Sequence, residues 1–275
     1  MTINRYSPNW LDELHERLSK LLLEFPQTHI YALIEGVLDE SCYRHLKRSK
    51  RLPYFALYAN TPGADEETLG ISPLLVEYRA EARDTWNALL DKTDGKPALS
   101  LIATQESLME LAQRLTPWCI VNADGYTLAL SFADTRILPE LCAVLTPLQH
   151  AQFFGPAHCW QYVTRAASWA TLPLPKSNAS PAREVALDQR QCAQLMAAAE
   201  ADNILHQLRT ATAAAIVDCH APARAHELVR HWLTCADRAR ISATPDRIGL
   251  CEWGLQHAGM ENHLQVADWL AMRHA

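Results

Sequence analysis

The histidines and cysteines of the C-terminal half are the side chains best suited to chemistry. His226, His231, Cys235 and Asp237 lie close together, and His231 and Cys235 share one face of a predicted helix at a spacing of four residues. Two ligands at that spacing can bind one metal ion. The sequence has no CxxC or HExxH motif and no second pair of ligands, so a buried cysteine beside a surface histidine explains the pattern better. We therefore predict no metal site, and a small metal-dependent or Cys/His hydrolase is the alternative function.

Nucleophilic and phosphate chemistry have weaker support. The neighbouring pairs His158-Cys159 and Cys219-His220 point in different directions on a strand or a helix, so neither is arranged for proton transfer. GxSxG and SxxK motifs are absent, and none of the nine glycines lies in a phosphate-binding motif. We predict a protein without catalytic residues, cofactor or small-molecule substrate.

Charge limits the class of partner. The chain carries 25 Lys and Arg against 31 Asp and Glu, a net charge of −6, whereas nucleic-acid binding requires a basic surface. The basic run from Arg44 to Arg51 either steers an acidic partner or compensates the dipole at a helix C-terminus, and the second interpretation is favoured. Glu35 ends an apolar segment and is a candidate buried carboxylate with a perturbed pKa, although a carboxyl in this position more often reaches solvent or a backbone amide.

The sequence predicts a cytoplasmic protein. Its first helix mixes charges with leucines, unlike an export signal, and no run of about 18 apolar residues is present to span a bilayer. The eight cysteines are scattered through predicted helices and strands, which favours a reducing compartment.

Two differently built lobes are expected from a chain of 275 residues. In the first lobe, residues 1–172, an amphipathic helix from Trp10 to Phe25 precedes alternating strands and helices, which predicts an α/β lobe. The predicted strands cover residues 29–35, 53–58, 71–78, 98–103 and 158–164. Thr104 is the expected cap of the helix that follows the fourth of them.

A tight hairpin is predicted between Trp118 and Phe132. The dipeptide Asp124-Gly125 tolerates positive φ at both centres of a type I′ turn, so the flanking segments fold together as antiparallel strands. The sheet of the first lobe is therefore expected to be mixed. Asp134 follows the hairpin and is predicted to cap a helix.

A proline-rich linker at residues 173–182 is predicted to join the lobes. Residues 183–275 contain no lysine, are rich in alanine and lack strand-like alternation, which predicts an all-α lobe. One helix of this lobe has a clear apolar stripe, formed by Ala225, Leu228, Val229, Trp232, Leu233 and Ala236.

Several segments of the first lobe together resemble a known family. They are Tyr31 to Gly36, Leu57 to Pro62, Ser72 to Val76, the helix from Ser107 to Leu115, Asp134-Thr135-Arg136, and Phe153 to Pro156 with Trp160. Their order over about residues 28–162 is similar to that in the Tap-type adaptor (chaperone) family of bacterial type VI secretion, long filed as a domain of unknown function.

The resemblance implies a cytoplasmic, non-catalytic adaptor that binds a toxic effector and helps load it onto the spike protein of the secretion apparatus. Asp134 and Arg136 match the family at the corner after the hairpin and are candidate partner-binding residues. Ser131, Ala133 and Thr135 depart from it, since they stand where an arginine, an aromatic residue and a proline are expected.

Three tryptophans are further candidates for partner-binding residues. Aromatic anchors dominate binding hot spots, and eight tryptophans are more than a core of this size requires. Trp160, Trp232 and Trp253 are therefore candidate partner-binding residues, while core packing is the favoured explanation for most of the tryptophans. The expected partners are an effector and the spike protein, with no nucleic acid and no membrane.

Overall fold

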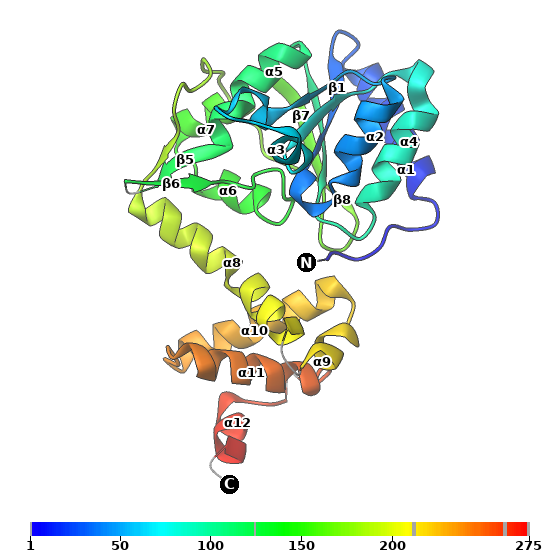
Figure 1. The fold of residues 1–275 in the computed structure, drawn as a ribbon. Coiled ribbons are helices and arrows are strands. Elements are labelled where there is room, and N and C mark those ends of the chain that lie inside the picture. The colour runs from blue at the N-terminus through cyan, green and yellow to red at the C-terminus, as the bar shows by residue number, and fades with distance from the viewer. Residues whose placement is uncertain (1, 124, 211–212, 261–262, 274–275) are drawn as a thin grey trace. The chain divides into compact units, whose positions relative to one another are not determined.

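The computed structural model describes residues 2–123, 125–210, 213–260 and 263–273. Their contacts divide the chain into two compact units (Figure 1). Residues Arg5–Leu195 form an α/β unit, and Thr2–Asn4 with the described residues from Met196 onward form a helical unit. The predicted fold class, a sheet with helices followed by an all-helical part, is confirmed.

A six-stranded antiparallel sheet organises the α/β unit. Its order is β2-β3-β1-β4-β7-β8, and each neighbouring pair in this order is antiparallel. The strands are β1 (His29–Ile34), β2 (Tyr54–Ala56), β3 (Leu74–Glu77), β4 (Leu99–Thr104), β7 (Ala157–Val163) and β8 (Trp169–Thr171). The central strands β1 and β4 are almost wholly buried because both faces of the sheet are covered.

Helices lie on both faces of this sheet (Figure 1). One group is α1 (Trp10–Glu24), α2 (Ser41–Ser49) and α4 (Arg83–Leu90), and the other is α5 (Leu108–Leu115), α6 (Leu138–Val144) and α7 (Pro147–Phe154), with the short α3 (Glu66–Gly70) near the end of β2. Side chains alternate along a strand, so Tyr31 and Leu33 pack toward α5–α7 whereas Ile30 and Ala32 lie on the opposite face. The strand pattern thus positions two separate apolar layers.

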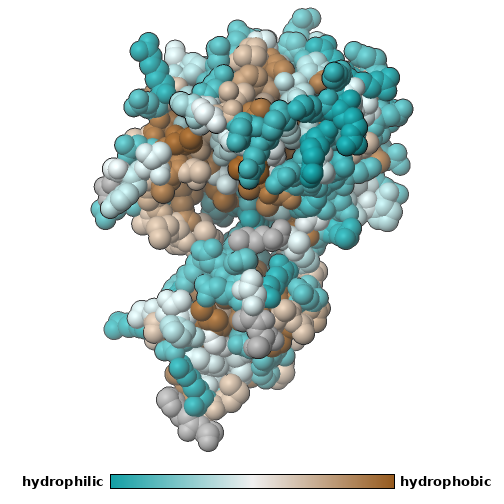
Figure 2. Space-filling model, in the orientation of Figure 1, coloured by the Kyte–Doolittle hydropathy of each residue, from teal (hydrophilic) through white to brown (hydrophobic). Residues whose placement is uncertain are grey.

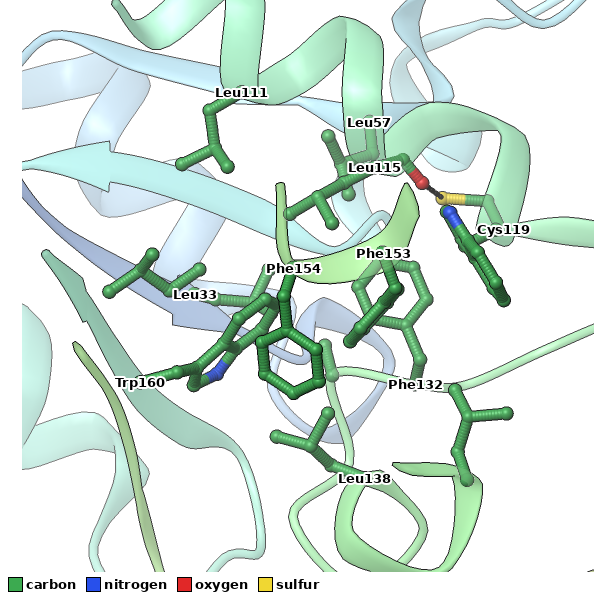
Figure 3. Close-up of a cluster of buried hydrophobic side chains, with 14 of the residues drawn as sticks. Leu33, Leu57, Leu111, Leu115, Cys119, Phe132, Leu138, Phe153, Phe154 and Trp160 are labelled. Atoms are coloured by element: carbon green, nitrogen blue, oxygen red, sulfur yellow. Dashed lines mark hydrogen bonds between the residues drawn. The ribbon is translucent and has the colours of Figure 1, made fainter. Parts of the chain in front are cut away.

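The layer between the sheet and α5–α7 is built around aromatic rings (Figure 3). Phe153 and Phe154 from α7 meet Trp160 from β7, with ring centroids 5.1 Å and 5.2 Å from the indole. Trp118 and Phe132 pack edge-on against Phe153. These edge-to-face and offset contacts are favourable geometries for aromatic rings, so this cluster holds α7 and β7 together.

Helix α5 begins three residues later than the sequence predicts. Ser107 is its N-cap: the hydroxyl accepts the Glu110 N–H, and the Glu110 carboxylate accepts the Ser107 N–H at 2.8 Å. This reciprocal capping box satisfies two backbone donors that a helix start leaves open. Thr104 instead ends β4, where the register with β7 shifts, so its predicted capping role is wrong.

A second, smaller sheet has the order β6-β5-β9. The predicted hairpin is confirmed: β5 (Ile120–Ala123) pairs antiparallel with β6 (Tyr126–Ala129), and Gly125 has φ +83°. Asp124, the other predicted turn residue, lies outside the described residues. β5 also pairs in parallel with β9 (Ala186–Leu187), so this smaller sheet is mixed, as predicted. The sequence did not predict β9, because the segment around it is rich in alanine and lacks strand-like alternation.

The segment predicted as a linker packs against the α/β unit. Leu174 and Ala182 contact the aromatic cluster, as do Val185 and Leu187 just beyond it. The contacts divide the chain later, after Leu195 and within the long helix α8 (Gln189–Thr210). Residues 173–182 thus belong to the α/β unit.

The helical unit contains the C-terminal part of α8 with α9 (Ala214–Asp218), α10 (Pro222–Arg238), α11 (Thr244–Gln256) and α12 (Val266–Arg273). All six residues of the predicted apolar stripe on α10 are buried, which confirms that helix and its face. Asn4 from the N-terminus accepts the N–H of Ala223 at the start of α10. In the described parts of both units, no helix combines the length and apolarity needed to cross a bilayer.

Candidate protein-binding site

Asp134 and Arg136 form a buried ion pair at the corner between β6 and α6. Arg136 Nε donates to Asp134 Oδ1 at 3.0 Å, the Arg136 backbone N–H donates to the same oxygen at 2.9 Å, and the two side chains are only 8% and 4% exposed. The Asp134 carbonyl oxygen accepts from Leu138 at the start of α6. The pair therefore fixes the corner, and neither charge is presented at the surface of the unit.

Glu35 lies beside this corner and is also buried. Removal from water and the charge of Asp134 raise the pKa of Glu35 to about 8, against the opposing effect of backbone N–H groups of Val37 and Asp134. One carboxyl oxygen of Glu35 has no hydrogen-bond partner among the described residues. The buried position of this candidate is confirmed, and at neutral pH it holds a proton, because burial disfavours the charged form and the nearby charge of Asp134 adds to this effect.

A second buried ion pair was not expected from the sequence. Arg114 on α5 donates from Nε to Glu106 Oε1 at 2.7 Å, and its Nη1 donates to the carbonyls of Gln152 and Ala179 at 3.1 and 3.2 Å. A Cβ on Gly155 would lie 2.2 Å from the guanidinium, and Gly155 has φ +51°, so glycine is required there. Arg114 thus joins α5, α7 and the proline-rich segment, a structural role.

The three candidate tryptophans are core residues. Trp160 is fully buried and donates from Nε1 to Ser100 Oγ at 3.1 Å. Trp232 and Trp253 meet edge-to-face in the helical unit, with centroids 5.2 Å apart, and are also buried. The structure therefore places Asp134, Arg136 and all three tryptophans inside the two units, so none of these five side chains is presented as a binding surface.

The proposed metal ligands do not assemble. His231 Nε2 lies 3.7 Å from Cys235 Sγ, but Asp237 pairs with Arg247 at 2.6 Å instead of completing a site. Within the described chain, no group of three or more His, Cys, Asp or Glu side chains is arranged to hold a metal ion.

The buried thiols are poor nucleophiles. Burial raises the pKa of Cys142 and of Cys251 to about 12, which keeps both protonated at neutral pH. Neither adjacent His-Cys pair is arranged for catalysis: Cys159 is buried next to a histidine that stacks on Phe25, and His220 bonds the carbonyl of Leu255.

The basic run forms an exposed surface at the end of α2. Lys47 pairs with Glu66 at 2.6 Å, while Arg48, Lys50 and Arg51 are exposed. The last turn of α2 carries Lys47 and Arg48, as expected where cations compensate the helix dipole. A hollow of about 310 Å³ lies elsewhere, between α1 and β7, and is lined mainly by charged side chains of both signs.

The β5–β6 hairpin carries a group of exposed apolar side chains that the sequence reasoning missed. Tyr126, 74% exposed, and Leu128, 50% exposed, lie on one face of the hairpin, and Ile120, 43% exposed, lies on the other. Figure 2 shows hydrophobic residues gathered at the left edge of the α/β unit, where Figure 1 places this hairpin. The sequence did contain a signal for these exposed side chains, namely a lack of charge: from Cys119 to Ala133 the only charged residue is Asp124. Exposed apolar patches of this kind are typical of protein-binding surfaces.

The α/β unit matches one family model. Residues 30–152, from β1 to α7, match the family described as a domain of unknown function (DUF4123), which is associated with type VI secretion. This range lies within the predicted region of resemblance and includes the hairpin and the buried Asp134–Arg136 corner. No curated protein and no solved structure matches the chain.

Proposed function

We propose that the protein is a cytoplasmic adaptor that binds a type VI secretion effector and promotes its loading onto the spike protein. The observation that carries this proposal is the match of residues 30–152 to a family associated with type VI secretion. The exposed apolar side chains of the hairpin support it, because an adaptor needs a surface for another polypeptide. Such a role requires no catalytic residue, cofactor or small-molecule substrate.

The test is co-purification with defined partners. The full chain is produced with the spike protein and with candidate effectors of a type VI secretion system from the same cells, and each pair is separated by affinity and size-exclusion chromatography. We expect a complex with at least one of the two, and loss of effector secretion when the gene is deleted. Secretion that continues unchanged in the deletion strain, together with no complex, would contradict an adaptor role.

The alternative is a small metal-dependent or Cys/His hydrolase, which rests on the contact between His231 and Cys235. Metal analysis of the purified protein and the variant Cys235→Ser separate the two functions. Stoichiometric zinc that is lost in the variant favours a hydrolase. An adaptor is expected to keep its complexes after this substitution.

A further inference from the structure

We propose that the outer edge of β6 binds an extended segment of the client polypeptide by strand addition, and that this segment is uncharged and apolar at alternate positions. The inference rests on the proposed function for the origin of the segment, but the binding mode is argued from the hairpin alone. In the sheet order β6-β5-β9, β6 is an edge strand, and none of the described strands pairs with its outer side.

The hydrogen-bond phase of the hairpin shows which backbone groups face outward. The Asn122 N–H donates to the Val185 carbonyl on the β9 side of β5, so the groups of Asn122 point away from β6. Its register partner on β6 is Thr127. In an antiparallel pair, two directly opposite residues either bond each other through their N–H and C=O groups or both point these groups away. The N–H and C=O of Thr127 therefore point away from β5, to the open edge.

A second bond confirms this phase. The Leu130 N–H donates to the Cys119 carbonyl at 2.9 Å, which places the bonded pairs at every second position along the hairpin. Ala129 lies opposite Ile120, and Thr127 opposite Asn122, at positions where the two strands do not exchange hydrogen bonds. The outward row of β6 therefore contains the donors and acceptors of Thr127 and Ala129, at the spacing that a new strand needs.

The usual protections of an edge strand are missing here. Exposed edges are commonly blocked by lysine, proline, a bulge or a covering segment. β6 has the sequence Tyr-Thr-Leu-Ala, pairs with β5 without a register shift, and is exposed at all four residues. A regular and uncharged edge is therefore open to an incoming strand.

The side chains of β6 add apolar contacts on one face. Tyr126 lies opposite Ala123 and Leu128 opposite Val121, and the two β5 residues are buried while their β6 partners are exposed. The covered face of β5 therefore continues onto β6 without cover. An added strand that places apolar side chains at alternate positions would extend this layer, which is how strand addition combines main-chain bonds with side-chain specificity.

The occupant is a peptide segment and not a second copy of the chain. A standard dimer interface uses about 20–30 residues a side, whereas the hairpin offers three exposed large apolar side chains, Ile120, Tyr126 and Leu128. Main-chain hydrogen bonds supply much of the affinity when a strand is added, so a short segment suffices. The absence of lysine and arginine along Cys119–Ala133 disfavours an acidic segment as the occupant.

The test uses a defined peptide and the full-length protein. The probe is a fluorescein-labelled hexapeptide of alternating threonine and valine, N-methylated at every second residue so that one edge is blocked and the peptide cannot associate with itself. The control is the same hexapeptide with every amide N-methylated. Fluorescence anisotropy is expected to show saturable binding of the probe and at least tenfold weaker binding of the control. Equal binding of both peptides would overturn strand addition, because apolar contact alone would then explain it.

Substitutions at Thr127 locate the edge. Thr127→Pro removes an outward N–H without removing a bond to β5, and we expect at least a tenfold loss of probe affinity. Thr127→Val keeps the N–H and the probe affinity. If Thr127→Pro does not fold, Ala129→Pro tests the same row. An affinity unchanged in the folded proline variants contradicts the proposal, as does a wild-type dimer in sedimentation that Thr127→Pro dissociates.

The same variants separate this inference from the adaptor function. A folded Thr127→Pro protein that still retains the effector at the wild-type level overturns strand addition by the client while the adaptor function stands. Loss of the effector in Thr127→Pro but not in Thr127→Val supports both. If wild-type protein retains neither the effector nor the spike protein and secretion continues without it, the adaptor function fails, and the peptide measurements alone decide whether the edge accepts a strand.

Discussion

The two units bury charge differently. In the α/β unit, the side chains of Arg114 and Glu106 are 7% and 9% exposed, and the ion pair bonds the carbonyl of Ala179 in an irregular segment. In the helical unit, Arg247 is mostly buried, but its partners Glu200 and Asp237 are 36% and 66% exposed. Helices satisfy their own backbone groups, whereas irregular segments need side-chain partners. Buried ion pairs therefore fix the non-helical corners of the α/β unit.

The largest expected effect comes from breaking the Arg114–Glu106 pair. Arg114→Met leaves the Glu106 carboxylate buried without a cation, which costs about 3–5 kcal/mol of unfolding free energy. Urea denaturation followed by tryptophan fluorescence measures the change, and hydrogen exchange assigns it to α5. In the double variant Arg114→Met with Glu106→Gln, much of the loss should be recovered.

The matched substitution in the helical unit is Arg247→Met. Its carboxylate partners reach water, so we expect a loss of only about 1 kcal/mol. Equal losses for Arg114→Met and Arg247→Met would contradict the difference between the two units.

Glu35→Gln tests the buried acid by its pH dependence. Burial raises the pKa of Glu35 in the folded protein to about 8, above its ordinary value of 4.5. The wild type therefore loses stability relative to the variant as the pH rises from about 4.5 to about 8, by roughly 1.4 kcal/mol per pH unit. Urea denaturation at several pH values measures the difference. Glu16→Gln, at an exposed carboxyl, is the control, and parallel pH profiles of wild type and Glu35→Gln would show that Glu35 ionises normally.

Gly254→Ala probes packing in the helical unit. A Cβ at Gly254 would lie 2.1 Å from the Trp232 ring, which is fully buried, so we expect a loss of about 1–3 kcal/mol. Gly249→Ala is the control on the same helix, because a Cβ at Gly249 would lie 3.5 Å from the Trp269 ring, an ordinary contact distance. The gain in helix propensity should leave Gly249→Ala neutral or more stable. Thermal denaturation distinguishes them, and equal melting temperatures would contradict the close approach of α11 and Trp232.

Ser107→Ala is expected to have a small effect, similar to that of Arg247→Met. Loss of the N-cap hydroxyl that accepts the Glu110 N–H costs about 1 kcal/mol. Ser19→Ala, on the exposed face of α1, should leave urea denaturation unchanged or slightly improved. A Ser107→Ala protein as stable as the wild type would show that water replaces the cap.

Local patterns predicted much of the fold. The apolar stripe of α10 and the turn at Gly125 both depend on residues close in the chain, and both are present. The sequence reasoning failed where the partner is distant: β9 is stabilised by pairing with β5, and neither Ala186 nor Leu187 shows a strand pattern. The buried acid at Glu35 was only a candidate, because an apolar strand before a carboxyl does not show whether the side chain reaches water.

The candidate site could be predicted only in part. The near absence of charge around the hairpin was visible in the sequence, but the exposure of Tyr126 and Leu128 depends on β6 lying at the sheet edge, which strand order decides. Trp160 and Trp232 remained candidate partner contacts until the structure showed both to be buried, because composition records how many aromatic residues are present and not where they lie.

The sequence by itself determined the helices, most strands and the change from an α/β to a helical architecture, because periodicity and turn residues act over a few neighbouring positions. Tertiary structure alone decided that the main sheet is antiparallel, that Arg114 meets Glu106, Gln152 and Ala179, and that β6 keeps an open edge. Each of these depends on contacts between residues far apart in the chain, for which no local pattern encodes the partner.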